Sequence, residues 1–385
     1  MKTYYIKADR FLLENRTITN KYLQIEDSKF GSFVDQPPAN SEVADWSGYT
    51  IAPGLFDTHI HGIKGNDVMD GSKQAIKNIS KELLKIGVTR FLPTTLTAST
   101  EDLNQAVAAV AEAVDEGLPG AQSEGIYLEG PYFTETHKGA QNPVYFKDPS
   151  YEEFQQWQQR SNNQIVKIAL APERKGAKEF IRKMTLEGIK VSLGHTNASY
   201  DCCREAVDAG ADIFVHLFNG MKGLHHREPG VVGAACTLQH TFAELICDGH
   251  HVHPVVASMV AQMKKEQLVL ITDCMRAGLM PDGVYQLGEF PVHMENGMAR
   301  TETGSLAGST LQLVHGVKNL QAWTQMPLYE IWHRASLSPA KSLHKENKLG
   351  SIAPGKLADY VVLDNQLEVH AAAIEGEVKY QQKHE

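Results

Sequence analysis

Two histidines, His59 and His61, stand one residue apart at the end of an apolar segment, and a glycine follows them. Side chains alternate between the two faces of a β-strand, so a strand that ends here would project both imidazoles to the same side. Such a pair can hold a metal ion, although a motif this short also occurs without one. The interpretation therefore depends on whether other strand ends supply further ligands.

Four further side chains that can bind a metal end apolar segments of the chain: Glu129, His195, His216 and Asp273. Each of them alone is more often a satisfied core or rim residue than a ligand. Six such groups at strand ends are a different matter, because a buried polar group without a partner costs several kcal/mol. We therefore predict a site for a divalent metal ion with nitrogen and oxygen ligands.

Ligation by histidine and carboxylate without thiolate is typical of catalytic rather than structural metal sites. A metal in such a site lowers the pKa of bound water to about 7 and polarises a carbonyl, as amide hydrolysis at neutral pH requires. Asp273, beside the metal, suits a general base that later acts as a general acid. The metal could be zinc, iron, manganese or cobalt, with zinc, iron or manganese favoured and one or two ions per subunit.

The segments that must position these groups alternate between two patterns. Amphipathic helices are predicted by the apolar periodicity of segments such as 73–86 and 103–115. Eight candidate strands lie at residues 51–59, 89–94, 125–129, 166–170, 189–195, 213–216, 242–247 and 268–273. This alternation predicts an α/β fold with a (β/α)8 TIM-like barrel. An open doubly wound sheet is the alternative, and polar residues at the carboxyl ends of many strands favour the barrel.

The two ends of the chain have a different pattern. Residues 1–50 alternate apolar and polar side chains around turn clusters, and residues 355–364 and 373–380 again resemble strands. Neither end has enough strands for a core of its own. We therefore expect a small β-sandwich formed by both termini, with segment 1–50 as its first part, a metal-dependent barrel over 51–345, and segment 346–385 as its second part.

Composition excludes several classes of function. The net charge of −9 argues against a binder of nucleic acid or of membrane surfaces, since both need a basic excess. The five cysteines are odd in number and lack framework spacing, which indicates reduced thiols. The first residues do not resemble a signal peptide, and no segment approaches the ~20 apolar residues of a membrane span. A cytoplasmic location is expected.

Several blocks of sequence carry a resemblance to a known family. In chain order they are PGLFDTHIHG at 53–62, LEGP at 128–131, GHT at 194–196, HLFNGM at 216–221, REPG at 227–230, DGHH at 248–251, TD at 272–273, LAGS at 306–309 and GSIAPGKLAD at 350–359. The chain resembles the amidohydrolase superfamily and, within it, the N-acetylglucosamine-6-phosphate deacetylases. The first and last blocks support the superfamily only, whereas LEGP, HLFN and REPG indicate the deacetylases.

The resemblance implies a ligand set and a reaction. Glu129, His195 and His216 would hold the principal metal, Asp273 would be the acid/base, and His59 and His61 would match members that hold a second metal. Many relatives bridge two metals with a carboxylated lysine on the fourth strand. Lys167 lies at the start of that strand, so we interpret it as a surface or packing lysine and expect Glu129 to be the bridging carboxylate.

The implied reaction is hydrolysis of N-acetyl-D-glucosamine 6-phosphate to acetate and D-glucosamine 6-phosphate. Asn219, Gly220 and His251 would contact the phosphate or sugar, and Arg227, a bidentate phosphate ligand, would reach it across a homodimer interface. The full set of expected substrate contacts is Ala140, Gln141, Asn219, Gly220, Arg227, His251, Leu306, Ala307 and Gly308.

One position departs from the family pattern. Some members have a histidine that helps to polarise the acetyl carbonyl where this chain has Gln141, and glutamine cannot carry charge. Together with His59 and His61, this favours a two-metal arrangement as a hypothesis. Two alternatives remain open: another amidohydrolase reaction, such as cyclic-amide hydrolysis or base deamination, and a non-catalytic barrel scaffold. The complete ligand set and Asp273 argue against the scaffold.

Overall fold

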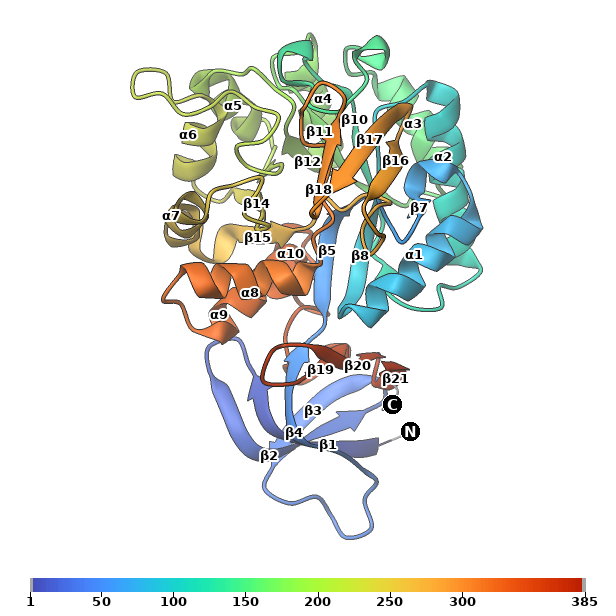
Figure 1. Ribbon diagram of the computed structural model, residues 1–385, viewed down its shortest axis with the longest axis vertical. Helices are drawn as coiled ribbons and strands as arrows, with labels where there is room; N and C mark the ends of the chain where they lie inside the picture. The colour runs from blue at the N-terminus through green and yellow to red at the C-terminus, as the bar shows by residue number, and fades with distance from the viewer. Residues whose placement is uncertain (1–2, 383–385) are drawn as a thin grey trace.

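The computed structural model describes residues 3–382, and a parallel barrel is its largest part (Figure 1). Hydrogen bonds connect eight parallel strands in the order β15-β14-β13-β12-β11-β10-β8-β5. Their bounds are β5 Leu55–Ile60, β8 Val88–Thr95, β10 Ile126–Tyr132, β11 Ile165–Leu170, β12 Lys190–Leu193, β13 Ile213–Phe214, β14 Phe242–Ile246 and β15 Leu268–Ile271. The predicted (β/α)8 barrel is confirmed, and each candidate strand overlaps one of these strands, although the first, 51–59, also includes the end of the preceding strand.

The barrel closes where its first and last strands end. The backbone N–H of Asp273 donates to the carbonyl of His59 at 2.9 Å, and the N–H of His61 donates to the carbonyl of Cys274 at 2.9 Å. The buried carboxylate of Asp57 adds a side-chain link, because it accepts the hydroxyl of Thr272 at 2.6 Å. Closure thus brings the two histidines at the end of the first strand beside the aspartate that follows the last.

Helices follow the strands and cover the outside of the barrel. Their bounds are α1 Lys73–Lys85, α2 Thr100–Asp115, α3 Tyr151–Arg160, α4 Ala177–Leu186, α5 Tyr200–Asp208, α6 Gly230–Thr237, α7 Pro254–Lys264, α8 Leu313–Trp323, α9 Leu328–Arg334 and α10 Leu337–Ser342. In α1, Ile76, Ile79 and Leu83 are fully buried, which is the spacing of one helix face turned to a core. The apolar periodicity of segments 73–86 and 103–115 therefore predicted α1 and α2 correctly.

A separate sheet from both ends of the chain lies at the amino-terminal end of the barrel (Figure 1). Its order is β21-β20-β19-β4-β1-β2-β3, and the bounds are β1 Thr3–Leu12, β2 Thr17–Glu26, β3 Lys29–Val34, β4 Val43–Pro53, β19 Tyr360–Leu363, β20 Val369–Ile374 and β21 Glu377–Gln381. The sheet bends back on itself, because Phe30 donates to the carbonyl of Lys356 and Ala358 donates to that of Ser28. Ile6, Phe11 and other apolar side chains fill the fold between its halves, as expected for the small sandwich.

Two details of this terminal sheet differ from the sequence expectation. The change from the terminal sheet to the barrel falls at Gly54, between β4 and β5, whereas the expected boundary was residue 50. The segment 373–380 is not one strand but parts of β20 and β21 joined by a turn. Glu375 and Gly376 have φ angles of 51° and 79° there, a left-handed backbone that turns the chain.

A buried arginine joins the terminal sheet to the barrel. Arg90 of β8 forms two hydrogen bonds with the Asp359 carboxylate, at 2.6 Å and 3.2 Å, and a third with Glu124 at 2.9 Å. Arg90 and Asp359 are both buried. The aspartate of the GKLAD block thus has a structural role, as the anchor between the two parts of the chain.

A three-stranded antiparallel sheet lies at the carboxyl end of the barrel, opposite the terminal sheet (Figure 1). It was not predicted from the sequence. It consists of β16 Gly283–Leu287, β17 Phe290–Glu295 and β18 Met298–Thr301. Val292 and Met294 pack against Leu96 and Met275, so the small sheet rests on the loops after β8 and β15. Three short pieces complete the strands: β6 Gly62–Ile63, β7 Asn66–Asp67 and β9 Gln122–Ser123.

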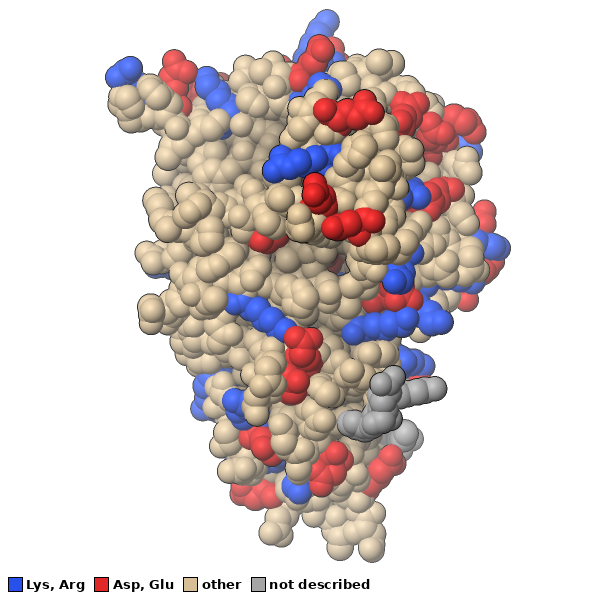
Figure 2. Space-filling view, viewed as in Figure 1, with Lys and Arg blue, Asp and Glu red and all other residues tan. Residues whose placement is uncertain are grey.

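The surface bears charges of both signs. On the face shown in Figure 2, basic and acidic side chains are interspersed, and the whole chain has a net charge of −9. Among residues 3–382, the helices are too short or too polar to cross a membrane.

Candidate active site

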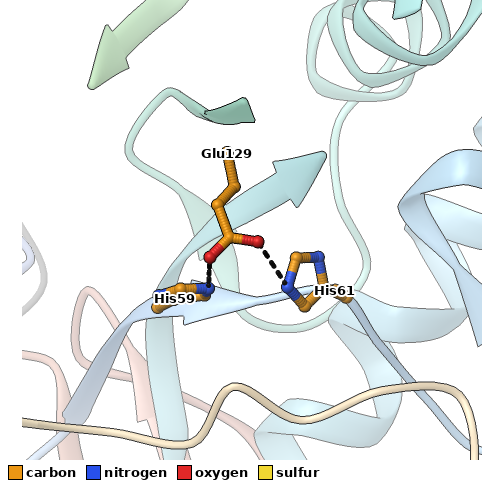
Figure 3. Close-up of side chains that lie close together, drawn as sticks. All are labelled: His59, His61 and Glu129. Atoms are coloured by element: carbon orange, nitrogen blue, oxygen red, sulfur yellow. Dashed lines mark ion pairs between the residues drawn. The ribbon is translucent and has the colours of Figure 1, made fainter. Parts of the chain in front are cut away.

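Glu129 stands at the centre of a cluster of histidines at the carboxyl end of the barrel. Its Oε1 lies 3.2 Å from His59 Nε2, 3.5 Å from His195 Nε2 and 3.2 Å from His216 Nε2. Its Oε2 lies 3.4 Å from His61 Nε2, so the carboxylate spans the two histidines of the first strand (Figure 3). The structure thus forms two overlapping groups of possible metal ligands, which share Glu129.

Asp273 completes the set of six. Its Oδ1 lies 3.1 Å from His61 Nε2 and 3.5 Å from His59 Nε2. Asp273, His195 and His216 have φ angles of 50°, 46° and 26°. A left-handed backbone costs a residue other than glycine about 1–3 kcal/mol and is concentrated at functional sites. The chain therefore turns sharply at three of the strand ends that carry the candidate ligands.

The outer nitrogen of three histidines is fixed by the backbone. Nδ1 of His61 lies 3.2 Å from the Thr94 carbonyl, and Nδ1 of His195 lies 3.1 Å from that of His137. Nδ1 of His216 lies 3.0 Å from the carbonyl of Asn219. A carbonyl can only accept, so Nδ1 carries the proton and Nε2 of the neutral ring is free to bind a metal.

Without a metal, protons compensate the charge of the cluster. Burial alone would lower the pKa of His59, but Glu129 and Asp273 outweigh it and raise the pKa to about 9. Burial would also lower the pKa of His61, but hydrogen bonds to Asp273 and Glu129 outweigh it and raise this pKa well above its usual value. Burial would also raise the pKa of Glu129, but the charge of His59 and bonds from the other histidines hold it well below its usual value.

A divalent metal fits these residues. Within residues 3–382, the buried Nε2 of His59 has no hydrogen-bond partner, although Glu129 lies at ion-pair distance. A cation between the imidazoles and the carboxylates would satisfy this atom and replace the bound protons. Imidazole and carboxylate ligands suit several first-row metals, so the donor set alone does not select one.

A cavity of ≈290 Å³ opens above the cluster. Most of the residues expected to contact substrate line it: Ala140, Gln141, Asn219, Gly220, His251, Leu306 and Gly308. Ala307 is fully buried behind this wall, among the apolar residues under the small sheet. Arg227 lies on an exposed loop, outside the residues that line the cavity of its own chain. Leu96, Leu287 and Ser305 also line the cavity and were not expected.

Gln141 has both ends of its amide engaged. Its Nε2 donates to Glu129 Oε2 at 2.6 Å, and its Oε1 accepts the backbone N–H of Thr97 at 3.0 Å. The side chain is 2% exposed. Gln141 therefore holds the shared carboxylate in place from the loop after β10, besides lining the cavity.

Lys167 is not a surface lysine, so that part of our interpretation was wrong. It is fully buried inside the barrel, where its ammonium contacts Glu244 of β14 and lies 3.8 Å from the centre of the Tyr127 ring. Position 167 is one at which the strand faces the barrel interior, because the neighbouring Ile168 packs outward against the helices. Glu244 was not predicted from the sequence as a functional residue, although a charged residue within an otherwise apolar strand could have indicated such a role.

The class of protein follows from these observations. It is a (β/α)8 barrel whose strand ends gather histidines and carboxylates able to hold a divalent metal. Comparison with known proteins defines the family: the amidohydrolase family model matches residues 50–382, and the chain belongs to this family.

Individual relatives are similar over most of their length. The chain is 44% identical over 330 residues to an N-acetylglucosamine-6-phosphate deacetylase from Vibrio furnissii, which covers 86% of this chain and 83% of that protein. It is 41% identical over 376 residues to an N-acetylgalactosamine-6-phosphate deacetylase from Escherichia coli O157:H7, covering 98% and 99%.

A solved structure is similar throughout. It is a mutant of the N-acetyl-D-glucosamine-6-phosphate deacetylase from Mycobacterium smegmatis in complex with N-acetyl-D-glucosamine-6-phosphate. The TM-score is 0.93 at 31% sequence identity, and the match covers 99% of this chain and 100% of that chain.

Proposed function

We propose that this protein hydrolyses the acetamide of N-acetyl-D-glucosamine 6-phosphate to acetate and D-glucosamine 6-phosphate. The observation that carries the proposal is the cavity in which Glu129, His195, His216 and Asp273 lie beside the residues expected to contact substrate. The similarity to deacetylases of phosphorylated N-acetyl sugars, over nearly the whole chain, supports the same reaction.

Glu129, His195 and His216 would hold one divalent metal, and His59 and His61 with Glu129 would hold a second. When bound, the metal supplies a more acidic water and an electrophile for the amide carbonyl. Asp273 takes the proton of the attacking water on its carboxylate and returns it to the amide nitrogen, so that the sugar leaves as a neutral amine. Its side chain faces the cavity, as this transfer requires.

Gln141 acts through Glu129 in this proposal. By donating to Oε2 at 2.6 Å, it fixes the carboxylate that the two metal positions share. Metal analysis of fully active protein tests the two-metal arrangement, for which we expect two ions per chain. One ion per chain at full activity would contradict the second position and leave the reaction itself untouched.

The phosphate end of the substrate requires a second copy of the chain. Arg227 is exposed and lies outside the cavity of its own chain, as expected for a side chain that serves a neighbouring subunit. Helix α7 presents Val255, Met259 and Met263 at 61%, 55% and 50% exposure, spaced four residues apart on one face. We expect this face to lie in a homodimer interface. Met259→Lys should then shift the protein to monomers in sedimentation, and a dimer that withstands it would remove this face from the interface.

The sugar itself has two candidates, because one relative is named for the galactosamine substrate and others for the glucosamine substrate. The test is acetate release from both sugar phosphates and from N-acetylglucosamine without phosphate. We expect the 6-phosphate to raise kcat/KM by about 10- to 100-fold, because one hydrogen bond to a charged group contributes about 1.5–3 kcal/mol. Arg227→Ala should remove most of this difference, and equal turnover of the unphosphorylated sugar would refute the proposed phosphate site.

We also propose a cytoplasmic location. All five cysteines are free thiols, which suits a reducing compartment. Cell fractionation tests this location.

A further inference from the structure

A charged pair lies inside the barrel, directly beneath the candidate metal ligands. Lys167 of β11 contacts Oε1 of Glu244 on β14, and the two side chains are 0% and 2% exposed. Barrels of this type usually fill their interior with layers of branched apolar side chains. The pair is therefore an exception that needs a physical reason.

Stability alone does not supply that reason. The free-energy cost of taking two charges out of water offsets much of their mutual attraction. Replacement of such a pair by apolar side chains is therefore often neutral or stabilising. A buried pair that touches a functional group has a more direct explanation, namely that its charge or geometry serves that group. The next question is what Glu244 touches besides Lys167.

One oxygen of Glu244 is directed at a candidate metal ligand. Oε1 accepts hydrogen bonds from the ammonium of Lys167 and, at 3.4 Å, from the hydroxyl of Thr58. Oε2 lies 3.5 Å from Nδ1 of His59. Both of these atoms are buried, and within the described chain neither has a hydrogen-bond partner. Each of the two atoms can therefore satisfy the other if the ring donates from Nδ1.

His59 differs in this respect from the other histidines of the cluster. His61, His195 and His216 each direct Nδ1 at a backbone carbonyl. Only the Nδ1 of His59, among these four, faces a carboxylate. A carboxylate on the outer nitrogen orients a histidine ligand, fixes its tautomer and raises its basicity, and its loss typically weakens metal binding 10–100-fold.

We propose that Glu244, held by Lys167, is a positioning residue that keeps Nδ1–H of His59 on Oε2 and so directs Nε2 toward Glu129. The pair then sets the affinity of the metal position formed by His59, His61 and Glu129. The position formed by Glu129, His195 and His216 does not depend on it. This inference rests on the second metal position of the proposed function, and it is independent of which amide is hydrolysed.

The test is calorimetric titration of the metal-free full-length chain with cobalt(II). Lys167→Met/Glu244→Leu removes the acceptor and leaves no buried charge behind. Lys167→Met/Glu244→Gln removes the charges but keeps an acceptor oxygen. Ser192→Ala is the matched control, because Ser192 is also fully buried, its Oγ lies 3.2 Å from the Tyr127 hydroxyl, and its hydrogen bonds do not include His59.

We expect the leucine variant to bind the second cobalt ion about 10–100-fold more weakly than the wild type. Its affinity for the first ion should stay within about twofold of the wild-type value. The glutamine variant should recover part of the affinity, and the control should match the wild type. An unchanged second affinity in the leucine variant, or equal weakening of both ions, would overturn the inference. So would a wild-type chain that binds a single ion.

A second measurement keeps the inference testable if a variant does not fold. In the wild-type chain loaded with zinc, the NMR shifts of the imidazole nitrogens of His59 must report a proton on Nδ1. A proton on Nε2 would overturn the inference. Failure of the proposed reaction would give a different result. If the cobalt titrations came out as expected but no acetate were released, the reaction would be refuted and this inference would stand.

Discussion

Replacement of Gln141 by leucine tests whether this side chain supports the shared carboxylate. The change keeps the volume nearly constant and removes two hydrogen bonds, one to Glu129 Oε2 at 2.6 Å and one from the Thr97 N–H at 3.0 Å. A bond to a charged group contributes about 1.5–3 kcal/mol, and an unpaired buried N–H costs about 1–3 kcal/mol. Leucine buries more apolar surface than glutamine, which offsets part of this loss. We expect the free energy of unfolding to fall by about 3 kcal/mol.

Urea unfolding of the metal-free chain measures this change through the shift of the midpoint at constant slope. Gln156→Leu, at an exposed position of α3, is the matched control and should change the free energy of unfolding by less than about 0.5 kcal/mol. A loss below about 1 kcal/mol for Gln141→Leu, similar to the control, would refute the structural role assigned here.

Three further predictions concern Asp273, the buried Arg90–Asp359 pair and the pKa of His59. Asp273→Asn should lower kcat by about 10²–10⁴-fold while metal content stays within a factor of two, and wild-type turnover would refute its role as acid/base. Asp359→Asn should lower the free energy of unfolding by about 3 kcal/mol in chemical denaturation, because it weakens the buried pair with Arg90; Asp45→Asn, in an exposed pair, should cost less than about 1 kcal/mol. The pKa of His59 is raised to about 9 in the metal-free chain, so the folded state binds the extra proton and its stability should fall by roughly 3 kcal/mol as pH rises from about 6.5 to 9. Saturating metal should remove this fall, whereas His59→Asn should remove the part due to His59 and leave the part due to His61, whose pKa is also raised. An equal pH slope in all three samples would contradict it.

The sequence was sufficient to predict the barrel and the side chains that cluster at its carboxyl end for a physical reason. Parallel strands covered on both faces are apolar throughout, so the histidine or carboxylate that ends such a strand stands out. Closure of the barrel then brings these ends together. The distances of 3.2–3.5 Å around Glu129 are the result of that topology rather than of any local motif.

The features that could not be predicted depend on contacts between distant segments. The strands β16 to β18 pack on the loops after β8 and β15, and their sequence has no long apolar run. The carbonyls that fix three histidines belong to the backbone, so no residue type marks them. Lys167 and Glu244 are 77 residues apart, and only the curvature of the barrel makes them partners.

The most direct test of the proposed reaction follows both products of one substrate at once. With a divalent metal and N-acetyl-D-glucosamine 6-phosphate, proton NMR should record acetate and D-glucosamine 6-phosphate appearing in equal amounts, and Asp273→Asn should slow the appearance of both by about 10²–10⁴-fold under the same conditions. Consumption of the substrate without acetate, or acetate release that is unchanged in Asp273→Asn, would contradict the proposed deacetylation mechanism.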